Sequence, residues 1–439
     1  MITVAPVGGY NEVGKNMTAI KIDDEVIILD MGLFIPAIID YQEETEKLTN
    51  KKLIEIGAIP NDEIITDWKS KVKAIVITHA HLDHAGAVPY LAPKYNAPII
   101  GTPFTIEVLK TIIEDKEKQV PNKLIKAQLN SQIKISKGIT IELINMTHST
   151  PHTALIAIHT KYGTILYAND FKLDNHPVIG QKPDYKKLKS LKNVKVLIVD
   201  SLYSAAERKT PSEKVVREML KDVMLGTDNK KHAIIVTTFS SHLARLKSII
   251  DFGQSLKRKI VFLGRSLDKY VIAGEKAKVI KFGKDIELLR FKNQIKKKLR
   301  QIEKNRGKYI IVCTGNQGEP KAILSKMVDG IVPFKFEYED HVIFSCRTIP
   351  TDQNIYNRKV LEDKLKSKGV RIFTEIHASG HAGREDLRDL INLVNPKNLI
   401  PTHGDIDKLK PLSDLAEEMG YKRGKNVHIL NDGQRLTIN

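Results

Sequence analysis

The chain contains only two cysteines among its 439 residues, Cys313 and Cys346, which lie far apart without a CxxC spacing. This scarcity excludes a disulfide framework and a thiolate metal site, so we expect a reducing, cytoplasmic location. Long apolar runs are missing too: no stretch of about 18 apolar residues occurs, and no basic segment followed by an apolar one opens the chain. We therefore expect a protein that is neither exported nor membrane-spanning.

Acidic residues are few relative to basic ones. The 52 Asp and Glu residues are outnumbered by 70 Lys and Arg residues, which gives a formal net charge of +18. Such an excess favours an anionic partner, nucleic acid or a phosphorylated ligand, although surface solubility alone would produce the same count. Residues 275–308 hold half of the excess, with 13 Lys and Arg against 4 Asp and Glu. This segment indicates either a solvated helix face or a surface that contacts nucleic acid.

The length and the apolar pattern predict two or three domains of mixed α/β structure. Up to about residue 205, short apolar strands alternate with Gly and Asn turns, and several strands stop at an acidic or His residue. Beyond that point helical and strand patterns alternate, in residues 212–224, 232–238, 242–252 and 259–263, which indicates a separate βαβ domain. Loops at strand ends are where such scaffolds present their site residues.

The segment THAHLDHAG, residues 78–86, places three histidines and an aspartate directly after a short apolar strand. Burying these groups without partners would be costly, so a compensating ion is expected. Neutral imidazole and ionised carboxylate are usual ligands of zinc. The spacing predicts that His79 and His81 bind one ion, and that Asp83 and His84 turn toward a second. The alternative is a polar loop that is rich in His by chance.

Three further candidate ligands, His148, Asp170 and His403, also follow predicted strands. A lone His in such a place is more often a capping or core residue, but its occurrence together with the HxHxDH loop favours metal ligation. We predict that His148 completes the first set, that His403 completes the second, and that Asp170 bridges the two ions. A pair of ions about 3.5–4 Å apart suits the hydrolysis of phosphodiesters.

In this order the motifs resemble those of the metallo-β-lactamase superfamily and, more closely, of its β-CASP nucleases of the ribonuclease J type, in an archaeal form. The similarity runs almost end to end through GGYNEVGKN, THAHLDHAGAVPYL, TTFSSHLARL, FLGRSL, CTGNQGEP, HASGHAGREDL and IPTHGD. It implies an α/β fold in which a metallo-β-lactamase αββα sandwich is interrupted by an inserted βαβ-type β-CASP domain. Residues 1–205 would form the first part of the sandwich, residues 206–365 the β-CASP domain, and residues 366–439 the C-terminal return that delivers His403.

The resemblance also implies roles for residues around the metals. Asp30 and Asp200 are expected to form hydrogen bonds to side chains of the centre without binding the metal themselves. His381 is expected to protonate the departing 3′ oxygen and to be catalytic together with Asp83 and Asp170, the alternative for His381 being a helix cap. Eight residues are expected to bind the substrate around its terminal 5′-phosphate nucleotide: Ser240, Ser241, His242, His377, Ala378, Ser379, Gly380 and His381.

The function that the resemblance implies is that of a zinc-dependent 5′ to 3′ exoribonuclease. It would act on single-stranded RNA with a 5′-monophosphate and release nucleoside 5′-monophosphates, in RNA decay and maturation. We expect two Zn²⁺ ions per chain, with Mn²⁺ as the alternative, and a homodimer. Endonucleolytic cleavage by the same fold is one alternative function. A small-molecule metallo-hydrolase is another, but it leaves the inserted domain and the charge of +18 without a use.

Overall fold

The computed structural model describes residues 1–40, 48–349 and 351–438, and the chain divides into two compact units. Unit 1 comprises Met1–Asn175, Gln181–Thr210 and Gly380–Asn439, and unit 2 comprises His176–Gly180 and Pro211–Ser379. The chain therefore leaves unit 1, builds unit 2 and returns to unit 1. Within the described part of the chain, no helix is both long enough and apolar enough to cross a membrane.

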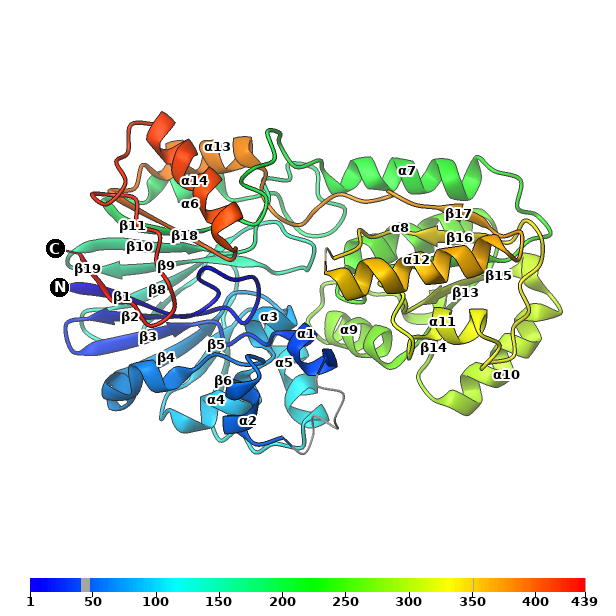
Figure 1. Ribbon diagram of the computed structural model, residues 1–439, viewed down its shortest axis with the longest axis horizontal. Helices are drawn as coiled ribbons and strands as arrows, with labels where there is room; N and C mark the ends of the chain where they lie inside the picture. Colours follow the sequence, from blue (N-terminus) through cyan, green and yellow to red (C-terminus); the bar gives the residue numbers. More distant parts are fainter. Residues whose placement is uncertain (41–47, 350, 439) are drawn as a thin grey trace. The chain divides into compact units, whose positions relative to one another are not determined.

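Unit 1 contains two sheets that lie face to face (Figure 1). The first sheet has the order β19-β1-β2-β3-β4-β5-β6. Its strands are β1 (Ile2–Gly8), β2 (Met17–Ile22), β3 (Glu25–Leu29), β4 (Val72–Ile77), β5 (Ile99–Gly101), β6 (Leu124–Lys126) and β19 (Leu436–Ile438). The second sheet has the order β18-β11-β10-β9-β8-β7. Its strands are β7 (Gln132–Lys134), β8 (Thr140–Asn145), β9 (Ala154–Thr160), β10 (Gly163–Ala168), β11 (Val194–Asp200) and β18 (Asn398–Thr402).

Helices cover the outer faces of both sheets of unit 1 (Figure 1). The helices on the side of the first sheet are α2 (Asn50–Glu55), α3 (Leu82–Ala85), α4 (Val88–Leu91) and α5 (Pro103–Asp115); α1 is Ile35–Asp40. The second sheet is covered by α6 (Tyr185–Ser190), α13 (Arg384–Val394) and α14 (Ile406–Glu418). Buried side chains such as Ile27 and Val76 of one sheet pack against Ile156 and Ile198 of the other. The unit is therefore the αββα sandwich that the sequence predicts.

The C-terminal segment contributes a strand to each sheet of unit 1. Strand β18 pairs in parallel with β11, and β19 pairs antiparallel with β1. His403 follows β18 directly, so pairing of this strand fixes its position although it lies more than 300 residues after the HxHxDH loop. The chain must return for the site to be complete.

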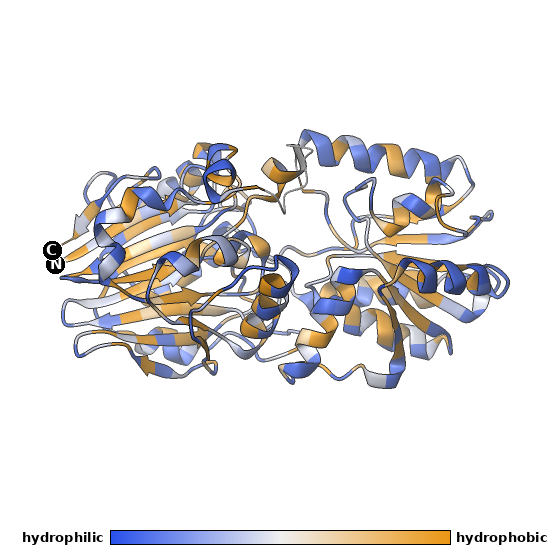
Figure 2. Cartoon of the chain, turned by 90° about the horizontal axis from the view of Figure 1, so that it is seen from below, coloured by the Kyte–Doolittle hydropathy of each residue, from blue (hydrophilic) through white to orange (hydrophobic). Residues whose placement is uncertain are grey.

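Unit 2 is built on one parallel sheet of order β14-β13-β15-β12-β16-β17. Its strands are β12 (Ile234–Thr237), β13 (Lys259–Leu263), β14 (Ile286–Leu289), β15 (Tyr309–Cys313), β16 (His341–Phe344) and β17 (Arg371–Phe373). The helices are α7 (Glu213–Leu225), α8 (Leu243–Ser255), α9 (Arg265–Lys276), α10 (Lys292–Glu303), α11 (Ile323–Val328) and α12 (Asp352–Lys366). Figure 2 shows these strands largely in the hydrophobic colour, as expected for a parallel sheet that helices cover on both faces.

The predicted elements of unit 2 are confirmed in kind, with shifted ends. The helix expected over residues 242–252 is α8, for which His242 is the N-cap. The strand expected over residues 259–263 is β13, with the same bounds. Both cysteines are buried and unpaired, as their spacing predicts.

Candidate metal centre

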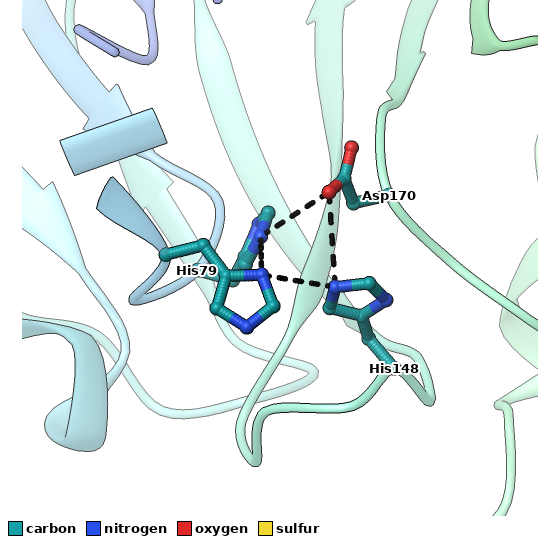
Figure 3. Close-up of side chains that lie close together, drawn as sticks. His79, His148 and Asp170 are labelled. Carbon is teal, nitrogen blue, oxygen red and sulfur yellow. Dashed lines mark hydrogen bonds and ion pairs between the residues drawn. The ribbon is translucent and has the colours of Figure 1, made fainter. Parts of the chain in front are cut away.

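The candidate ligands all belong to unit 1 and follow strands: Asp83 and His84 lie in the short helix α3, and the others lie on loops. His79 and His81 come directly after β4, and His148, Asp170 and His403 follow β8, β10 and β18. The ends of strands from both sheets thus bring together residues that are far apart in the sequence. Figure 3 shows the side chains of His79, His148 and Asp170 pointing toward one another.

Three sets of possible ligand atoms result, and all of them contain Asp170. The first set is His79, His81, His148 and Asp170, the second is Asp83, His84, Asp170 and His403, and the third is Asp170, Asp200, His381 and His403. Within each set the ligand atoms lie within 4.8 Å of one another. Asp170 Oδ2 is 3.6 Å from His79 Nε2 and 3.7 Å from His148 Nε2, and Asp170 Oδ1 is 3.8 Å from His403 Nε2. The first two sets contain the residues that the sequence groups together, and we call them the two ligand sets; their role in binding metal stays a prediction.

The spacing of the ring nitrogens fits a metal ion. His81 Nδ1 is 3.1 Å from both His79 Nε2 and His148 Nε2. Tetrahedral ligands at 2.0–2.1 Å from zinc would be about 3.3 Å apart, so the spacing of these ring nitrogens is compatible with a bound metal ion. Asp170 Oδ1 is buried and accepts no hydrogen bond from any residue that the structure describes. A buried carboxylate oxygen of this kind is a suitable ligand for a cation, which a bound metal ion would supply.

The second nitrogen of most of these imidazoles is anchored by the protein. His84 Nδ1 lies 2.8 Å from Asp30 Oδ2, and Asp30 also accepts hydrogen bonds from the N–H and hydroxyl of Thr78. His79 Nδ1 is 3.0 Å from the Thr78 hydroxyl, and His148 Nδ1 is 2.7 Å from the carbonyl oxygen of Gly380. Such contacts fix the tautomer and the ring orientation, which leaves Nε2 free to bind a metal.

Without a metal, the cluster divides into neutral and charged groups. Burial, together with neighbouring imidazoles, lowers the pKa of His79 and of His148 well below the usual value. Burial would also lower the pKa of His84, but Asp170, Asp83 and Asp30 outweigh it and raise the pKa well above the usual value. His79 and His148 are therefore already in the form that binds metal, whereas His84 must release a proton first.

Three residues of the centre adopt left-handed backbone conformations. The φ angles are 60° at Asp30, 49° at Asp170 and 59° at His403. A side chain in this region costs of order 1–3 kcal/mol, and such residues cluster at functional sites. The tight turns after the strands aim these three side chains at the cluster.

His381 lies beside the two ligand sets. Its Nδ1 is 2.8 Å from Asp200 Oδ2, its ring stacks on that of His403 with an interplanar angle of 9°, and its Nε2 is 3.9 Å from Asp170 Oδ2. Burial would lower the pKa of His381, but Asp200 and Asp170 raise it to about 9. Without a metal, these two carboxylates therefore favour the protonated imidazole, and its Nε2 lies on the side of the candidate metal ligands.

Sequence reasoning missed Asn16, whose side chain connects His403, near the end of the chain, with the HxHxDH segment. Its Oδ1 accepts a hydrogen bond of 2.9 Å from His403 Nδ1, and its Nδ2 donates to the carbonyl oxygen of Asp83. Nδ2 also lies 3.1 Å from His84 Nε2. The motif GGYNEVGKN contains this asparagine, but an Asn after a glycine turn carries no signal that separates this role from an ordinary turn.

The predicted substrate residues divide between the units. Gly380 and His381 belong to unit 1, and the others belong to unit 2: Ser240, Ser241, His242, His377, Ala378 and Ser379. Within unit 2, Arg245 connects residues 240–242 with residues 377–379. Its side chain is fully buried, and sequence reasoning missed it as well. Arg245 donates to the carbonyl oxygen of Ile376, next to His377, and its backbone N–H donates to the carbonyl oxygen of His242.

The charge of Arg245 is balanced by Glu213. Arg245 Nε and Nη2 donate to the two carboxylate oxygens of Glu213 at 2.5 and 2.8 Å, and His242 Nε2 is 3.3 Å from Glu213 Oε2. Arg245 Nη1 also donates to the carbonyl and hydroxyl oxygens of Ser345. Burial would raise the pKa of Glu213, but Arg245 and His242 outweigh it and hold the pKa well below the usual value. The charges of Arg245 and Glu213 thus neutralise each other, and the hydrogen bonds of this ion pair hold residues 240–242 and 377–379 in place.

Three parts of the chain match known families. Residues 10–199 match the metallo-beta-lactamase superfamily, residues 231–362 the ribonuclease J beta-CASP domain, and residues 370–430 the Zn-dependent metallo-hydrolase RNA specificity domain. The whole chain is 45% identical to Ribonuclease J of Methanocaldococcus jannaschii, over 99% of that protein. The chain belongs to the ribonuclease J family.

Other members of the ribonuclease J family agree with this assignment. Ribonuclease J of Pyrococcus abyssi is 41% identical over 100% of this chain and 97% of its own length. Ribonuclease J 1 of Streptococcus pyogenes is 30% identical, and the alignment spans 74% of that longer protein. A crystal structure of a protein of unknown function from Enterococcus faecalis V583 has the same fold, with a TM-score of 0.68 over 99% of both chains at 18% identity. The predicted metallo-β-lactamase fold with a β-CASP domain is thereby confirmed.

Proposed function

We propose that this ribonuclease J family member is a metal-dependent ribonuclease that degrades RNA from a 5′-monophosphate end, in the 5′ to 3′ direction, during RNA decay and maturation. The observation that carries the proposal is the convergence of imidazole and carboxylate ligand atoms around Asp170, whose buried Oδ1 accepts no hydrogen bond within the described part of the chain. The donor set contains no thiolate, which suits two zinc ions, with manganese as the alternative.

Each side chain of the centre has a separate task in this proposal. His79, His81 and His148 would hold one ion, Asp83, His84 and His403 the other, and Asp170 would bridge them. Bound metal ions would supply an activated hydroxide and stabilise charge on the phosphoryl oxygens. His381, oriented by its hydrogen bond to Asp200, would donate the Nε2 proton to the departing 3′ oxygen.

The preference for a 5′-monophosphate is proposed to come from the serine-rich and histidine-rich loops. Ser240, Ser241 and Ser379 offer small hydroxyl groups, and the HASGH segment offers backbone N–H groups that suit one phosphate. The nearby cation Arg245 is already paired with Glu213, which leaves little positive charge for the extra phosphates of a triphosphate. Each hydrolysis would release one nucleotide and leave a new 5′-monophosphate.

The experiment compares matched RNAs that carry 5′-monophosphate, 5′-triphosphate or 5′-hydroxyl ends, each labelled in parallel at the 5′ or the 3′ end. We expect mononucleotides to appear first from the 5′ end, fastest from the monophosphate, and Ser379→Ala to reduce this preference. Equal rates on all three ends, or release from the 3′ end first, would contradict the exonuclease assignment. Internal fragments that do not depend on the 5′ group would instead support the alternative, an endoribonuclease.

Three further expectations belong to the same proposal. The sequence-based boundaries, with residues 206–365 as the β-CASP domain between residues 1–205 and 366–439, remain predictions. So do a homodimeric state and a cytoplasmic location. Sedimentation of the purified chain over a range of concentrations would test the first of these two, and cell fractionation the second.

A further inference from the structure

Helix α10, Lys292–Glu303, has a basic face that the candidate metal centre does not use. Ile295, Leu299 and Ile302 are buried against the sheet of unit 2. At about 100° per residue, five basic side chains lie on an arc of about 140° that begins beside Leu299 and runs away from the buried side. These are the partly or fully exposed Lys292, Lys296, Lys297, Arg300 and Lys304, the last being the C-cap. Glu303 lies on the same arc and accepts a hydrogen bond from the backbone N–H of Lys335.

This basic face works against the stability of its own helix. Lys292 and Lys296, Lys296 and Arg300, and Arg300 and Lys304 are three successive like-charged pairs at i,i+4 spacing, which is destabilising. Lys292 also stands in the first turn, where the helix dipole favours an acidic residue. Helices α7, α9 and α12 of the same unit carry an acidic residue there, whereas α8, α10 and α11 carry none. The like-charged pairs thus give the helix no stability that would explain the positive face.

One lysine of α10 differs from the others. Lys298 forms an ion pair of 2.7 Å with Glu287, its side chain is 16% exposed, and its Nζ lies over the ring of Tyr309. This contact attaches the helix to strand β14 at the sheet edge. For the five basic residues of the exposed face, no ion pair is seen among the residues that the structure describes. Charge on that face is therefore available to an external anion.

An exposed aromatic ring adjoins the basic face. Phe291, the N-cap of α10, is 55% exposed, and the guanidinium of Arg290 lies 4.6 Å from its ring centroid. An aromatic ring beside a track of positive charge is the combination that holds single-stranded nucleic acid, because bases stack while phosphates follow the charges. We favour RNA over an anionic membrane, because the chain belongs to a ribonuclease family and RNA offers both phosphates and bases to this surface.

We propose that the α10 face, formed by Phe291 with Lys292, Lys296, Lys297, Arg300 and Lys304, is a second RNA-binding surface for single-stranded RNA beyond the nucleotides held at the hydrolytic site. The inference rests on the proposed function in taking RNA as the substrate. It assigns a use to the segment that holds half of the net charge of the chain. Long RNAs should gain affinity from this surface, and short ones should not.

The test compares RNAs of about 6 and about 30 nucleotides, since sites on single strands span roughly 4–16 nucleotides. Binding is measured in EDTA, with the wild type and a variant in which Lys292, Lys296, Lys297 and Arg300 are Gln, a good helix former. We expect affinity for the long RNA to fall on the order of tenfold at low salt. The salt slope should decrease by about 0.7 for each phosphate that the variant no longer neutralises. Binding of the short RNA should not change.

Two control variants separate this effect from general charge. Lys298→Gln removes one charge from the same helix, but from its buried side. Lys182, Lys186, Lys189 and Lys192, changed together to Gln, remove four exposed charges from unit 1. Neither control should change the length dependence. If the fourfold variant fails to fold, Lys292→Gln with Lys296→Gln and, separately, Phe291→Ala replace it, with a smaller loss expected only for the long RNA.

The possible outcomes distinguish the surface from the enzyme activity. Equal losses for both RNAs, an equal loss in the unit 1 control, or an unchanged salt slope would overturn the proposal. Loss of binding to anionic vesicles with RNA binding unchanged would assign the face to a membrane instead. A chain that binds long RNA through α10 but does not cleave RNA would leave the surface standing and refute the proposed function.

Discussion

Asp170 in unit 1 and Glu213 in unit 2 are both carboxylates buried next to histidines, but their partners differ. Both oxygens of Glu213 accept hydrogen bonds from one guanidinium, so the buried charges of Glu213 and Arg245 cancel. Asp170 has no Arg or Lys partner among the described residues, and its Oδ1 accepts no hydrogen bond. A closed ion pair holds loops in place, whereas an open cluster of ligand atoms is suited to bind a cation.

The largest effect is expected when a residue of the two candidate ligand sets is replaced. Asp83→Ala or His84→Ala should abolish RNA turnover, while RNA binding largely persists because most affinity comes from phosphate contacts elsewhere. Elemental analysis should show two zinc ions per chain in the wild type and fewer in the variants. His428→Ala, which removes a histidine that contacts Asn398 outside the cluster, should change neither result. Wild-type protein without a stoichiometric transition metal, purified without chelators, would refute the metal assignment.

Replacing His381 tests whether the candidate metal centre also contains a proton donor. His381→Gln should lower kcat by roughly 10²- to 10⁴-fold, as for other general acids, with zinc content and KM nearly unchanged. Asp200→Asn removes the charge behind the imidazole and should cause a smaller loss. Single-turnover kinetics would measure both effects on the chemical step. An unchanged rate in His381→Gln would refute its role as a proton donor; the alternative of a helix cap does not apply, because the N-cap of α13 is Gly383.

Breaking the closed pair should affect stability rather than metal content. Arg245→Met or Glu213→Leu leaves one buried charge without its partner and should cost about 3–5 kcal/mol of unfolding free energy. The double variant should recover much of that loss, because no charge remains unpaired. Urea unfolding would measure the three variants, and zinc content should stay at the wild-type value. Additive losses in the double variant would show that the pair acts through packing alone.

The smallest effect should be on the pH dependence of stability. The pKa of Glu213 is held well below its usual value in the folded protein, so its contribution is fully present above the unfolded value of about 4.3. That contribution is lost as the pH falls through the depressed folded pKa. Between about pH 5 and pH 3, the unfolding free energy of the wild type should therefore decrease more steeply than that of Glu213→Leu/Arg245→Met. Parallel curves would place the acid sensitivity elsewhere.

Much of the candidate centre could be predicted from the sequence, because the candidate ligands are recognisable from short stretches of sequence. His79, His81, Asp83 and His84 lie within six residues, and His148, Asp170 and His403 each end an apolar strand. The grouping into two sets with Asp170 between them followed from residue type and spacing. The apolar patterns predicted mixed α/β structure and a separate βαβ domain, whereas the αββα sandwich was expected from the resemblance of the motifs to a known family.

The rest was decided by tertiary structure. Asn16 reaches His403 only because β18 and the first loop meet at one edge of the sandwich, and nothing near either residue in the sequence signals that contact. Arg245 reads as part of an ordinary helix, yet it is fully buried against Glu213. Likewise, the sequence shows α10 as one lysine run, and only packing against β14 separates Lys298 from the exposed face. Residue type and local spacing determine which groups are able to bind a metal or RNA, but partners far along the chain, brought close by folding, determine which charges are already neutralised and which remain available.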